Sequence, residues 1–511
     1  MDISVAELVA RSITKHSERP AIYARGETLT YGMLGERVAA IRHRLREMGL
    51  EHAPRIGIVT GDDIATYTAI VAVMLNGSAY VPLNRKAPVA RNVDIVRDAE
   101  VSAVLSSSPD ELTEAVGVPV LTELSASNVP CEFEWQRPSP GDLAYLLFTS
   151  GSTGKPKGVP ISHGSLDRFM TMMLQEAGYR FEAEDRFLQM FELTFDLSVI
   201  SLFLPLCIGA SCHVVPDSRV GFVAALKVLQ DQCITVALMV PSLLAYVEPY
   251  LESMQLPDLR LSMFCGEALQ ERLVEKWSRV VDNRPIHNWY GPTEATIFCL
   301  RYEWDAQVSP DEAVNGIVPI GRPIGDTSAW LIDDSGNRID ATDTKGELVL
   351  GGQQLADGYW RNPEKTAEAF LRDDGSARPL GYRTGDVCYR NEKGDLVYCG
   401  RRDAQVKIDG HRVELGEIEH AVRTATGRSA VTVVPVPEGR GTSLVLFLEH
   451  PELDLPKLTA ELKRRLPAYM LPRHTHYLDR LPLNLNGKFD RPRMREIWAS
   501  SARAETLLRL S

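Results

Sequence analysis

The sequence predicts a layered α/β protein with a large amino-terminal domain, a small barrel-like subdomain, and a small α+β carboxy-terminal domain after a short hinge. Three observations predict this class. Apolar β-branched runs alternate with helix-like stretches up to about Ile317, short strands with turn residues follow, and the pattern changes again near Arg402. A chain of 511 residues is too long for a single core. We expect domains at residues 1–402 and 403–511.

The first part of the chain has the rhythm of a parallel sheet with helices on both faces. Residues 1–20 mix acidic with apolar residues, which favours a short amphipathic helix over a signal peptide. Short apolar runs that alternate with helical stretches are typical of parallel strands covered by helices. The expected strands are 55–60, 78–81, 101–105, 118–121, 144–148 and 234–240, and the expected helices include 64–75 and 220–229.

The later part of the chain has a different pattern. Ala329–Ile332 and Gly346–Leu350 are short apolar runs separated by the turn sequence DDSGN, which predicts an antiparallel or barrel-like subdomain. After residue 403 the expected elements are a strand at 405–408, a turn at Asp409–Gly410, a helix from Glu414, and strands at 430–436 and 443–448. These elements predict the small α+β domain, and the absence of a low-complexity linker predicts a short hinge.

Composition limits the classes of partner. The net charge of −12 argues against nucleic acid, because phosphate binding needs a basic face. No run approaches the roughly 18 apolar residues of a membrane span, so no membrane partner is expected. The eight cysteines form no CxxC pair. Scattered cysteines are more typical of reduced thiols in a cytoplasmic protein than of a zinc or redox site.

The most informative stretch is YLLFTSGSTGKPKGVPISH at 145–163. Its glycines allow positive φ and close backbone approach, while hydroxyl and amide groups can surround phosphate oxygens. It is not a Walker A loop, because Pro156 follows the lysine and prevents the required helix. By composition alone a flexible surface loop is the alternative. The candidate phosphate-binding residues are Thr149, Ser150, Gly151, Ser152, Thr153, Gly154 and Lys155.

The order of residues in this stretch resembles the phosphate-binding motif of the acyl-adenylate-forming superfamily. That superfamily includes acyl-CoA ligases, luciferases and the adenylation domains of nonribosomal peptide synthetases. The chain is most similar to free-standing amino acid adenylation enzymes, including D-alanine–carrier protein ligases, and the resemblance runs nearly from end to end. It implies ATP as a substrate and Mg²⁺ as a cofactor.

The resemblance also implies roles for residues in later motifs. In NWYGPTEAT, Tyr290 would stack on adenine, Thr293 would meet the α-phosphate, and Glu294 would help to hold Mg²⁺. An aromatic ring suits a base and a carboxylate suits a hard cation. In YRTGDVCY, Asp386 would bind the ribose hydroxyls, with Arg401 beside the nucleotide. The other expected ATP-site residues are Gly266, Glu267, Asn288 and Gly291. Taken singly, each motif could be a capped turn or a surface charge.

The carboxy-terminal motifs imply a moving domain. Lys488 in PLNLNGKFDR matches the catalytic lysine, and the preceding Asn486–Gly487 pair can present it at a loop tip. Asp403 falls at the hinge of the family. The resemblance implies adenylation with Lys488 in the site, followed by rotation that brings the stretch around Lys407–His411 to the thioester-forming site.

One aspartate bears on the substrate. Asp196 in FELTFDLSVISLFLPLCIGA falls where amino-acid-activating members keep a carboxylate for the α-ammonium group. A buried ammonium group needs such a partner. The alternative is that Asp196 caps the helix that follows it. Asn84 in VPLNRKAP departs from the aspartate of many relatives, and we expect its role to be structural.

The side-chain pocket that the resemblance implies has no charged member. Its residues are Leu197, Ile200, Leu238, Met263, Cys265, Trp289, Ile297 and Phe298. A charged substrate side chain would lie unpaired among them. A small apolar amino acid is therefore expected, with alanine first and proline, glycine, serine and valine as alternatives. Neither chirality nor the pathway can be read from these residues.

The expected acceptor is the phosphopantetheine thiol of a separate carrier protein, because no LGGxS-like attachment site follows Lys488. Carrier proteins are usually acidic, so a basic patch is expected from Arg412, Lys463, Arg464 and Arg465. The alternatives are an acyl- or aryl-CoA ligase with the same two half-reactions, and a non-enzymatic binding module. Asp196 speaks against the CoA ligase.

Overall fold

The structure is a computed structural model, and its contacts divide the chain into two compact units. The described residues are 3–51, 53–122, 124, 132–149, 156–218, 221–372, 378–402, 405–428, 430–439, 441–449, 453–482 and 489–510, without the side chains of 405 and 502–510. The second unit combines residues 403–511 with the short segments 86–91 and 149–157. The units are therefore not two continuous pieces of chain, and the functional roles of residues 1–402 and 403–511 stay a prediction.

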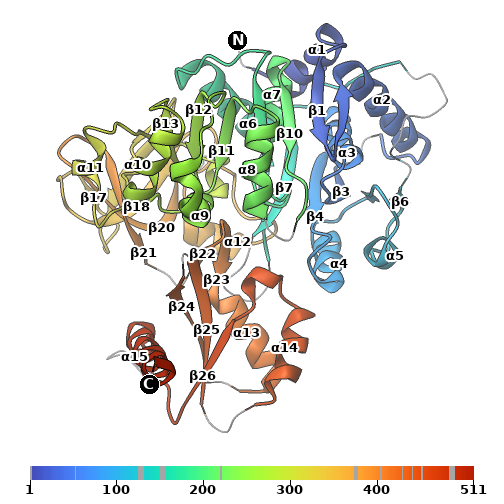
Figure 1. Cartoon of the computed structure of the whole chain (residues 1–511). Coiled ribbons are helices and arrows are strands. Elements are labelled where there is room, and N and C mark those ends of the chain that lie inside the picture. Colours follow the sequence, from blue (N-terminus) through green and yellow to red (C-terminus); the bar gives the residue numbers. More distant parts are fainter. Residues whose placement is uncertain are drawn as a thin grey trace. The chain divides into compact units, whose positions relative to one another are not determined.

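A nine-stranded sheet organises the first unit. Its strands, in spatial order, are β15 (Arg322–Pro323), β14 (Leu300–Glu303), β13 (Ile286–Tyr290), β12 (Leu261–Phe264), β11 (Val236–Met239), β9 (Arg186–Gln189), β10 (Ser211–Val214), β1 (Pro20–Ala24) and β2 (Glu27–Thr30). The strands from β13 to β1 run parallel. At one end β2 pairs antiparallel with β1, and at the other β14 pairs antiparallel with both β13 and the edge strand β15. The green helices α7 and α8 lie along this sheet in Figure 1.

The first unit contains a second, mostly parallel sheet. Its order is β6 (Val120–Leu121), β5 (Ala103–Leu105), β3 (Arg55–Val59), β4 (Ala79–Leu83), β7 (Leu143–Thr149) and β8 (Lys157–Ser162). The sequence predicts these strands except β8, but it groups them with β11 in one sheet. Sheet membership differs because pairing partners lie far apart in sequence, as where β1 pairs with β10. A strand's own residues carry little information about such non-local partners.

Helices connect the strands of the first unit. They are α1 (Val5–Lys15), α2 (Tyr31–Glu47), α3 (Ile64–Leu75), α4 (Val89–Asp98), α5 (Glu111–Ala115), α6 (His163–Thr171), α7 (Leu197–Ile208), α8 (Gly221–Asp231), α9 (Pro241–Val247), α10 (Glu271–Val280), α11 (Ser309–Glu312) and α12 (Pro363–Ala369). Shorter turns of helix are η1 (Met172–Glu176), η2 (Glu248–Ser253) and η3 (Thr293–Ala295). Every residue of α3 except Ala65 is buried, as expected for a helix that is apolar on all sides.

The predicted subdomain after residue 317 is an antiparallel sheet. Its strands are β16 (Ser328–Ile332), β17 (Arg338–Ile339), β18 (Gly346–Gly351), β19 (Phe370–Leu371), β20 (Gly381–Arg390) and β21 (Leu396–Arg401). Strand β20 is the long central member and pairs with β18, β19 and β21. The layered α/β class that the sequence predicts is confirmed.

The second unit is a small α+β structure with its own core. Its strands are β22 (Gln405–Ile408), β23 (His411–Glu414), β24 (Val431–Glu438), β25 (Gly441–Glu449) and β26 (His474–Leu478), and its helices are α13 (Leu415–Thr426), α14 (Leu455–Lys463), η4 (Ala468–Met470) and α15 (Arg491–Leu510). Asp409 and Gly410 both have positive φ at the β22–β23 turn. This Asp-Gly pair suits a tight hairpin turn, as the sequence predicts.

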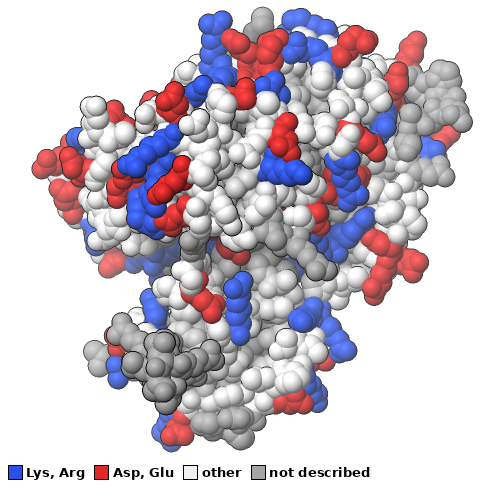
Figure 2. Space-filling view, in the orientation of Figure 1, with Lys and Arg blue, Asp and Glu red and all other residues white. Residues whose placement is uncertain are grey.

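Charged side chains of both signs are mixed over the surface. In Figure 2, acidic and basic residues lie beside one another across the visible face. Among the described residues, no helix is long and apolar enough to cross a membrane.

Candidate active site

Strand β13 separates two sets of predicted site residues. Side chains alternate between the faces of a strand, so Asn288 and Tyr290 share one face while His287 and Trp289 share the other. Tyr290 reaches a polar cluster, and Trp289 is buried among apolar side chains. We call these the polar side and the apolar side of β13.

On the polar side, Tyr290 and Arg401 meet at Asp386. The Tyr290 hydroxyl donates to one carboxylate oxygen of Asp386, and Arg401 donates to the other at 2.7 Å. Asp386 and Arg401 are direct cross-strand partners on β20 and β21, which explains why they meet. Burial, followed by the negative charge of Asp386, raises the pKa of Tyr290 well above its usual value. Tyr290 therefore stays a neutral donor at working pH.

Glu294 is a second carboxylate on the chain that follows β13. It lies in the short helix η3, is fully buried, and accepts a 2.8 Å hydrogen bond from the Tyr359 hydroxyl. The hydroxyl oxygen of Tyr359 lies 3.2 Å from that of Tyr382, so Glu294, Tyr359 and Tyr382 are connected by hydrogen bonds. Thr293 is the preceding residue and is also buried. This arrangement holds the Glu294 carboxylate in one orientation.

The donor set is compatible with Mg²⁺ bound together with phosphate oxygens. Magnesium is usually held by one or two carboxylates, with substrate phosphates and water supplying the other ligands. Glu294 offers one hard carboxylate oxygen of that kind. Within the described ranges there is no group of three or more acidic, histidine or cysteine side chains that could hold a metal without such help.

The turn that follows β13, at residues 291–298, is tightly constrained. A Cβ on Gly291 would lie 2.2 Å from Cα of Phe298, so only glycine fits there. Thr296 and Ile297 have φ values of 52° and 75°, which β-branched residues rarely adopt. The buried amide of Gln354 donates to the carbonyl oxygens of Ala295 and Phe298, and it holds this turn in place. Such strain is typical of functional sites that their surroundings over-determine.

Two other residues expected at the ATP site make structural hydrogen bonds, and a third has a backbone conformation that favours glycine. Asn288 donates to the carbonyl oxygen of Pro319 at 2.8 Å, and it is buried. Glu267 accepts from the backbone N–H of Ser242 at 2.8 Å, which satisfies a donor at the start of α9. Gly266 has φ of +97°, which accounts for the glycine at that position. Their predicted contacts with ATP stay a prediction.

Asp196 stands at the amino-terminal end of α7 in a buried setting. It occupies the N-cap position and is 3% exposed, but its side chain makes no capping hydrogen bond. Helix capping therefore does not explain this carboxylate. Burial, followed by the charge of Asp196, raises the pKa of Tyr80, and Asp196 also contributes to the raised pKa of Tyr145.

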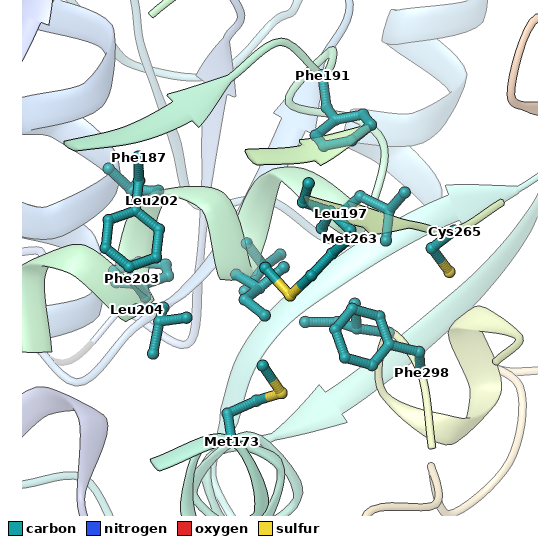
Figure 3. Close-up of a cluster of buried hydrophobic side chains, with 14 of the residues drawn as sticks. Met173, Phe187, Phe191, Leu197, Leu202, Phe203, Leu204, Met263, Cys265 and Phe298 are labelled. Atoms are coloured by element: carbon teal, nitrogen blue, oxygen red, sulfur yellow. The ribbon is translucent and has the colours of Figure 1, made fainter. Parts of the chain in front are cut away.

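The predicted pocket residues lie in the continuous core of the first unit. All eight are at most 3% exposed, and we call them the apolar wall: Leu197, Ile200, Leu238, Met263, Cys265, Trp289, Ile297 and Phe298. Figure 3 shows Leu197, Met263, Cys265 and Phe298 grouped in one part of this core. The ring centroids of Trp289 and Phe298 are 4.5 Å apart.

Sheet register explains why these apolar residues come together. Leu238 on β11 is the register partner of Met263 on β12, and Met263 is in turn the partner of His287 on β13. Register partners share a face of the sheet, so these three side chains form a row on the apolar side. Cys265 follows β12 two residues beyond Met263, and Trp289 follows His287 by the same step.

Several predicted site residues lie outside the described residues. They are Ser150, Gly151, Ser152, Thr153, Gly154, Lys155, Asp403 and Lys488. Thr149 lies at the end of β7, and its hydroxyl is 3.5 Å from the carbonyl oxygen of Lys157. Asn84 donates to Glu192 at 2.9 Å, and its backbone carbonyl accepts from Asn92, in line with the structural role expected for it.

Sequence reasoning missed Tyr359, Gln354 and Tyr179. Tyr359 and Gln354 follow Glu294 by many positions, and they reach the site only through the fold. The hydroxyl of Tyr179 accepts from the indole N–H of Trp289 at 3.2 Å. No local spacing links these residues to the motifs, so a signal would have to come from pairs that vary together among homologues.

Within an α/β core, the structure therefore places a cluster of carboxylate and aromatic side chains on one side of β13 and an apolar cluster on the other. The family model described as AMP-binding enzyme matches residues 9–360. The chain belongs to this family.

Curated relatives cover the chain over nearly its whole length. An L-proline–[L-prolyl-carrier protein] ligase from Streptomyces coelicolor is 34% identical over 525 residues, which cover 96% of both chains. The chain spans less than a tenth of the length of the first curated relatives it matches. One of these, tyrocidine synthase 3 from Brevibacillus parabrevis, is 32% identical over 93% of this chain and 7% of its own.

Solved structures share the fold. The Vibrio cholerae adenylation domain AlmE, solved in complex with glycyl-adenosine-5'-phosphate, has a TM-score of 0.84 and 27% identity, and 98% of each chain is covered. An o-succinylbenzoate CoA synthetase from Bacillus subtilis has a TM-score of 0.81 over 96% of this chain and 98% of its own. At 21% identity it shares the fold alone, so the fold does not separate amino acids from other acids as substrates.

Proposed function

We propose that the protein is a ligase that uses ATP to activate a small apolar amino acid as its aminoacyl-AMP and then transfers the aminoacyl group to the thiol of a carrier protein. The main support for an amino acid as the substrate is the position of Asp196. It is a buried carboxylate on the residue before Leu197, a member of the apolar wall. A buried carboxylate next to an apolar wall suits an amino acid substrate, because an ammonium group taken out of water needs a negative charge beside it.

The polar side of β13 provides the proposed nucleotide site. Tyr290 would stack on adenine, and Asp386 would accept from the ribose hydroxyls, with Arg401 holding its other oxygen. Thr293 would meet the α-phosphate. Glu294 would hold Mg²⁺ together with phosphate oxygens, and the ion when bound would offset negative charge on the phosphates. The 149–155 loop would surround the phosphates with hydroxyl and amide groups.

The first half-reaction makes a mixed anhydride. A carboxylate oxygen of the amino acid forms a bond to the α-phosphorus of ATP, and the bond from that phosphorus to pyrophosphate breaks. Pyrophosphate leaves with the electron pair. Lys488 would neutralise charge on the carboxylate and the α-phosphate during this step, as preorganised donors do in other active sites.

The second half-reaction makes a thioester. The sulfur of the carrier thiol bonds to the carbonyl carbon, and its proton passes to solvent. AMP leaves with the electron pair as the bond between the carbonyl carbon and the phosphate oxygen breaks. Residues 403–511 are proposed to rotate about Asp403 between the two steps. Asp403→Pro would then retain adenylation and lose transfer, because proline fixes φ at the hinge.

The carrier protein is proposed as the partner because the Streptomyces coelicolor relative is named a carrier protein ligase. The basic patch expected to meet it stays a prediction. Lys463, Arg464 and Arg465 are exposed just after or at the end of α14, and Arg464 pairs with Glu461 at 2.8 Å. Seven described cysteines are free thiols, which supports a reducing, cytoplasmic compartment.

The apolar wall is the basis for proposing a small side chain. Trp289, Phe298 and Met263 fill much of the space beside Leu197, and none of the eight wall residues carries a charge. Alanine is the first choice, with proline, glycine, serine and valine as alternatives. An acyl- or aryl-CoA ligase is the second candidate, because the o-succinylbenzoate CoA synthetase shares the fold.

The test is acid-dependent exchange of labelled pyrophosphate into ATP with L- and D-amino acids, aryl acids and fatty acids. The proposal requires the strongest exchange with alanine or another small apolar amino acid, followed by label transfer to a phosphopantetheinylated carrier protein. Exchange only with acids that lack an amine, with transfer to CoA, would replace the proposal with the CoA ligase. Lys488→Ala should lower adenylate formation by about 10²–10³ and spare thioester formation from synthetic adenylate.

A further inference from the structure

Two hydrogen bonds link the ring of Trp289 to Tyr179 and, through the same hydroxyl, to His287. The indole N–H of Trp289 donates to the hydroxyl oxygen of Tyr179 at 3.2 Å, and the same hydroxyl bonds to Nδ1 of His287. Tyr179 comes from the loop between η1 and β9, while His287 and Trp289 share one face of β13. The Tyr179 and His287 rings stack with centroids 5.2 Å apart. Trp289 is thereby fixed to an element outside its own sheet.

The three side chains linked by these hydrogen bonds allow one consistent assignment of donors and acceptors. Burial, followed by the positive charge of Arg301, lowers the pKa of His287 to about 3. Neutral His287 can accept the Tyr179 proton at Nδ1 and keep its own proton on Nε2, which lies 3.9 Å from Glu303. The Tyr179 oxygen is then an acceptor for Trp289, so both hydrogen bonds of the Tyr179 hydroxyl have one donor and one acceptor.

Arg301 contacts the rings of both Tyr179 and Trp289. Arg301 is the cross-strand partner of Trp289, and its guanidinium carbon lies 5.6 Å from the ring centre of Tyr179 and 5.7 Å from that of Trp289. It also donates to the carbonyl oxygen of Ala177, which is two residues before Tyr179. Cation–π contacts at these distances add to the hydrogen bonds that fix the indole.

We infer that Tyr179 and His287 are positioning residues that hold the Trp289 ring against the apolar wall and thereby limit the side chain of the acid substrate to a small size. This inference rests on the proposed function. Trp289 makes a 4.5 Å ring contact with Phe298, so its orientation sets the space next to that residue. An indole with three separate attachments has little freedom to move aside for a larger substrate.

The test is a double-mutant cycle between Tyr179→Phe and Trp289→Phe, measured by amino-acid-dependent pyrophosphate exchange. Tyr179→Phe keeps both ring contacts and removes only the hydroxyl. We expect it to lower the ratio of kcat/KM for alanine over valine or leucine by about 10-fold, because the indole N–H then lacks its buried acceptor. In the Trp289→Phe background the same change should alter the ratio by less than about 2-fold, since the N–H is already gone.

Tyr302→Phe is the matched control. Tyr302 follows Arg301 on β14, faces the other side of the strand, and bonds through its hydroxyl to Ser309 at 2.8 Å and to Glu312. The Tyr302→Phe variant also loses a buried hydroxyl group, so it shows how much such a loss alone affects stability. Its ratio of kcat/KM for alanine over valine or leucine should match that of the wild type. An active Tyr179→Phe variant with the wild-type ratio would overturn the inference, as would an equal effect in both backgrounds. Absence of exchange in the wild-type protein with every amino acid would instead reject the proposed function, and the inference with it.

Discussion

The two sides of strand β13 contain different kinds of site residue. On the polar side, Tyr290 reaches Asp386 and Arg401 through direct hydrogen bonds. On the apolar side, Trp289 joins a buried wall and is held by Tyr179, a residue that no motif contains. Polar partners leave recognisable motifs because each must offer one chemistry at one position. Apolar walls depend on combined shape, so their members look like core residues.

Replacing Asp196 should give the largest difference between the two sides of β13. We expect it to weaken use of the amino acid and to leave ATP binding unchanged. Asp196→Asn keeps the shape and removes the charge, so a substrate ammonium group would lose its buried partner at a cost of roughly 2–5 kcal/mol. We expect kcat/KM for the amino acid to fall by about 30-fold to several thousand-fold, with KM for ATP little changed. Asp185→Asn is the control, because Asp185 is a buried carboxylate that pairs with Arg260 and is not expected to contact the substrate. Equal losses in the two variants would contradict a substrate role for Asp196.

Gly291→Ala should damage both sides together. The new Cβ would lie 2.2 Å from Cα of Phe298 and would push apart the turn that joins Tyr290 to the apolar wall. Displacements of about 1 Å in a site can cost about 100-fold in rate, and we expect a loss of that order in pyrophosphate exchange. Gly141→Ala is the control, because a Cβ added at Gly141 would meet no other atom within 4 Å. Exchange by Gly291→Ala at the wild-type rate would show that the turn does not support the site.

Asp386→Asn should act only on the polar side. The carboxylate accepts from Tyr290 and Arg401, and hydrogen bonds to charged groups contribute about 1.5–3 kcal/mol. We expect kcat/KM for ATP to fall by roughly 10- to 100-fold, while the order of preference among amino acids is unchanged. Asp395→Asn removes a carboxylate that pairs with Arg322 in the first unit, and it should leave KM for ATP unchanged. A changed amino acid preference in Asp386→Asn would argue against separate subsites.

The smallest expected effect concerns pH and buried histidines. Burial lowers the pKa of His163 to about 4, and both of its ring nitrogens are without a partner among the described residues. Because the folded pKa is below the unfolded value of 6.5, its contribution to stability is full above pH 6.5 and is lost as pH falls toward 4. His163→Leu should reduce the pH dependence of the free energy of unfolding by up to about 1.4 kcal/mol per pH unit in this window.

Urea unfolding of wild type and His163→Leu at pH 7.5 and pH 5 measures this difference. His287 makes a useful comparison, because its lowered pKa of about 3 has a second cause in the charge of Arg301. His287→Gln should reduce the same slope over a window that reaches lower pH. Identical pH dependence in wild type and His163→Leu would contradict the buried neutral state of His163.

The sequence predicts the fold better than it predicts the site's supporting contacts. Helix α3 has the predicted bounds, and β11 lies where an apolar run indicates a strand, because local periodicity records burial. Strand β22 lies at the extended stretch predicted before the Asp409–Gly410 turn. The division of the parallel strands into two sheets depends on non-local pairing that periodicity does not record. The motif order singles out Asp386 and Arg401, and the structure brings them together as cross-strand partners.

Other features of the site could not be predicted from local pattern. Tyr359 and Gln354 contact the Glu294 segment from much later in the chain, and their own surroundings in sequence resemble ordinary turns. Glu267 satisfies a helix donor at Ser242, a contact that needs the structure to be seen. The pocket residues are buried to the same degree as their core neighbours, so burial does not mark them as a substrate wall.

A crystal structure with a non-hydrolysable alanyl-adenylate analogue tests the separation of the two sides most directly. We expect the adenine against Tyr290, the ribose hydroxyls at Asp386, the alanyl ammonium group at Asp196, and the methyl group against Trp289 and Met263. An alanyl group bound away from the apolar wall, or a ribose bound away from Asp386, would contradict the assignment of the polar side to ATP and the apolar side to the amino acid.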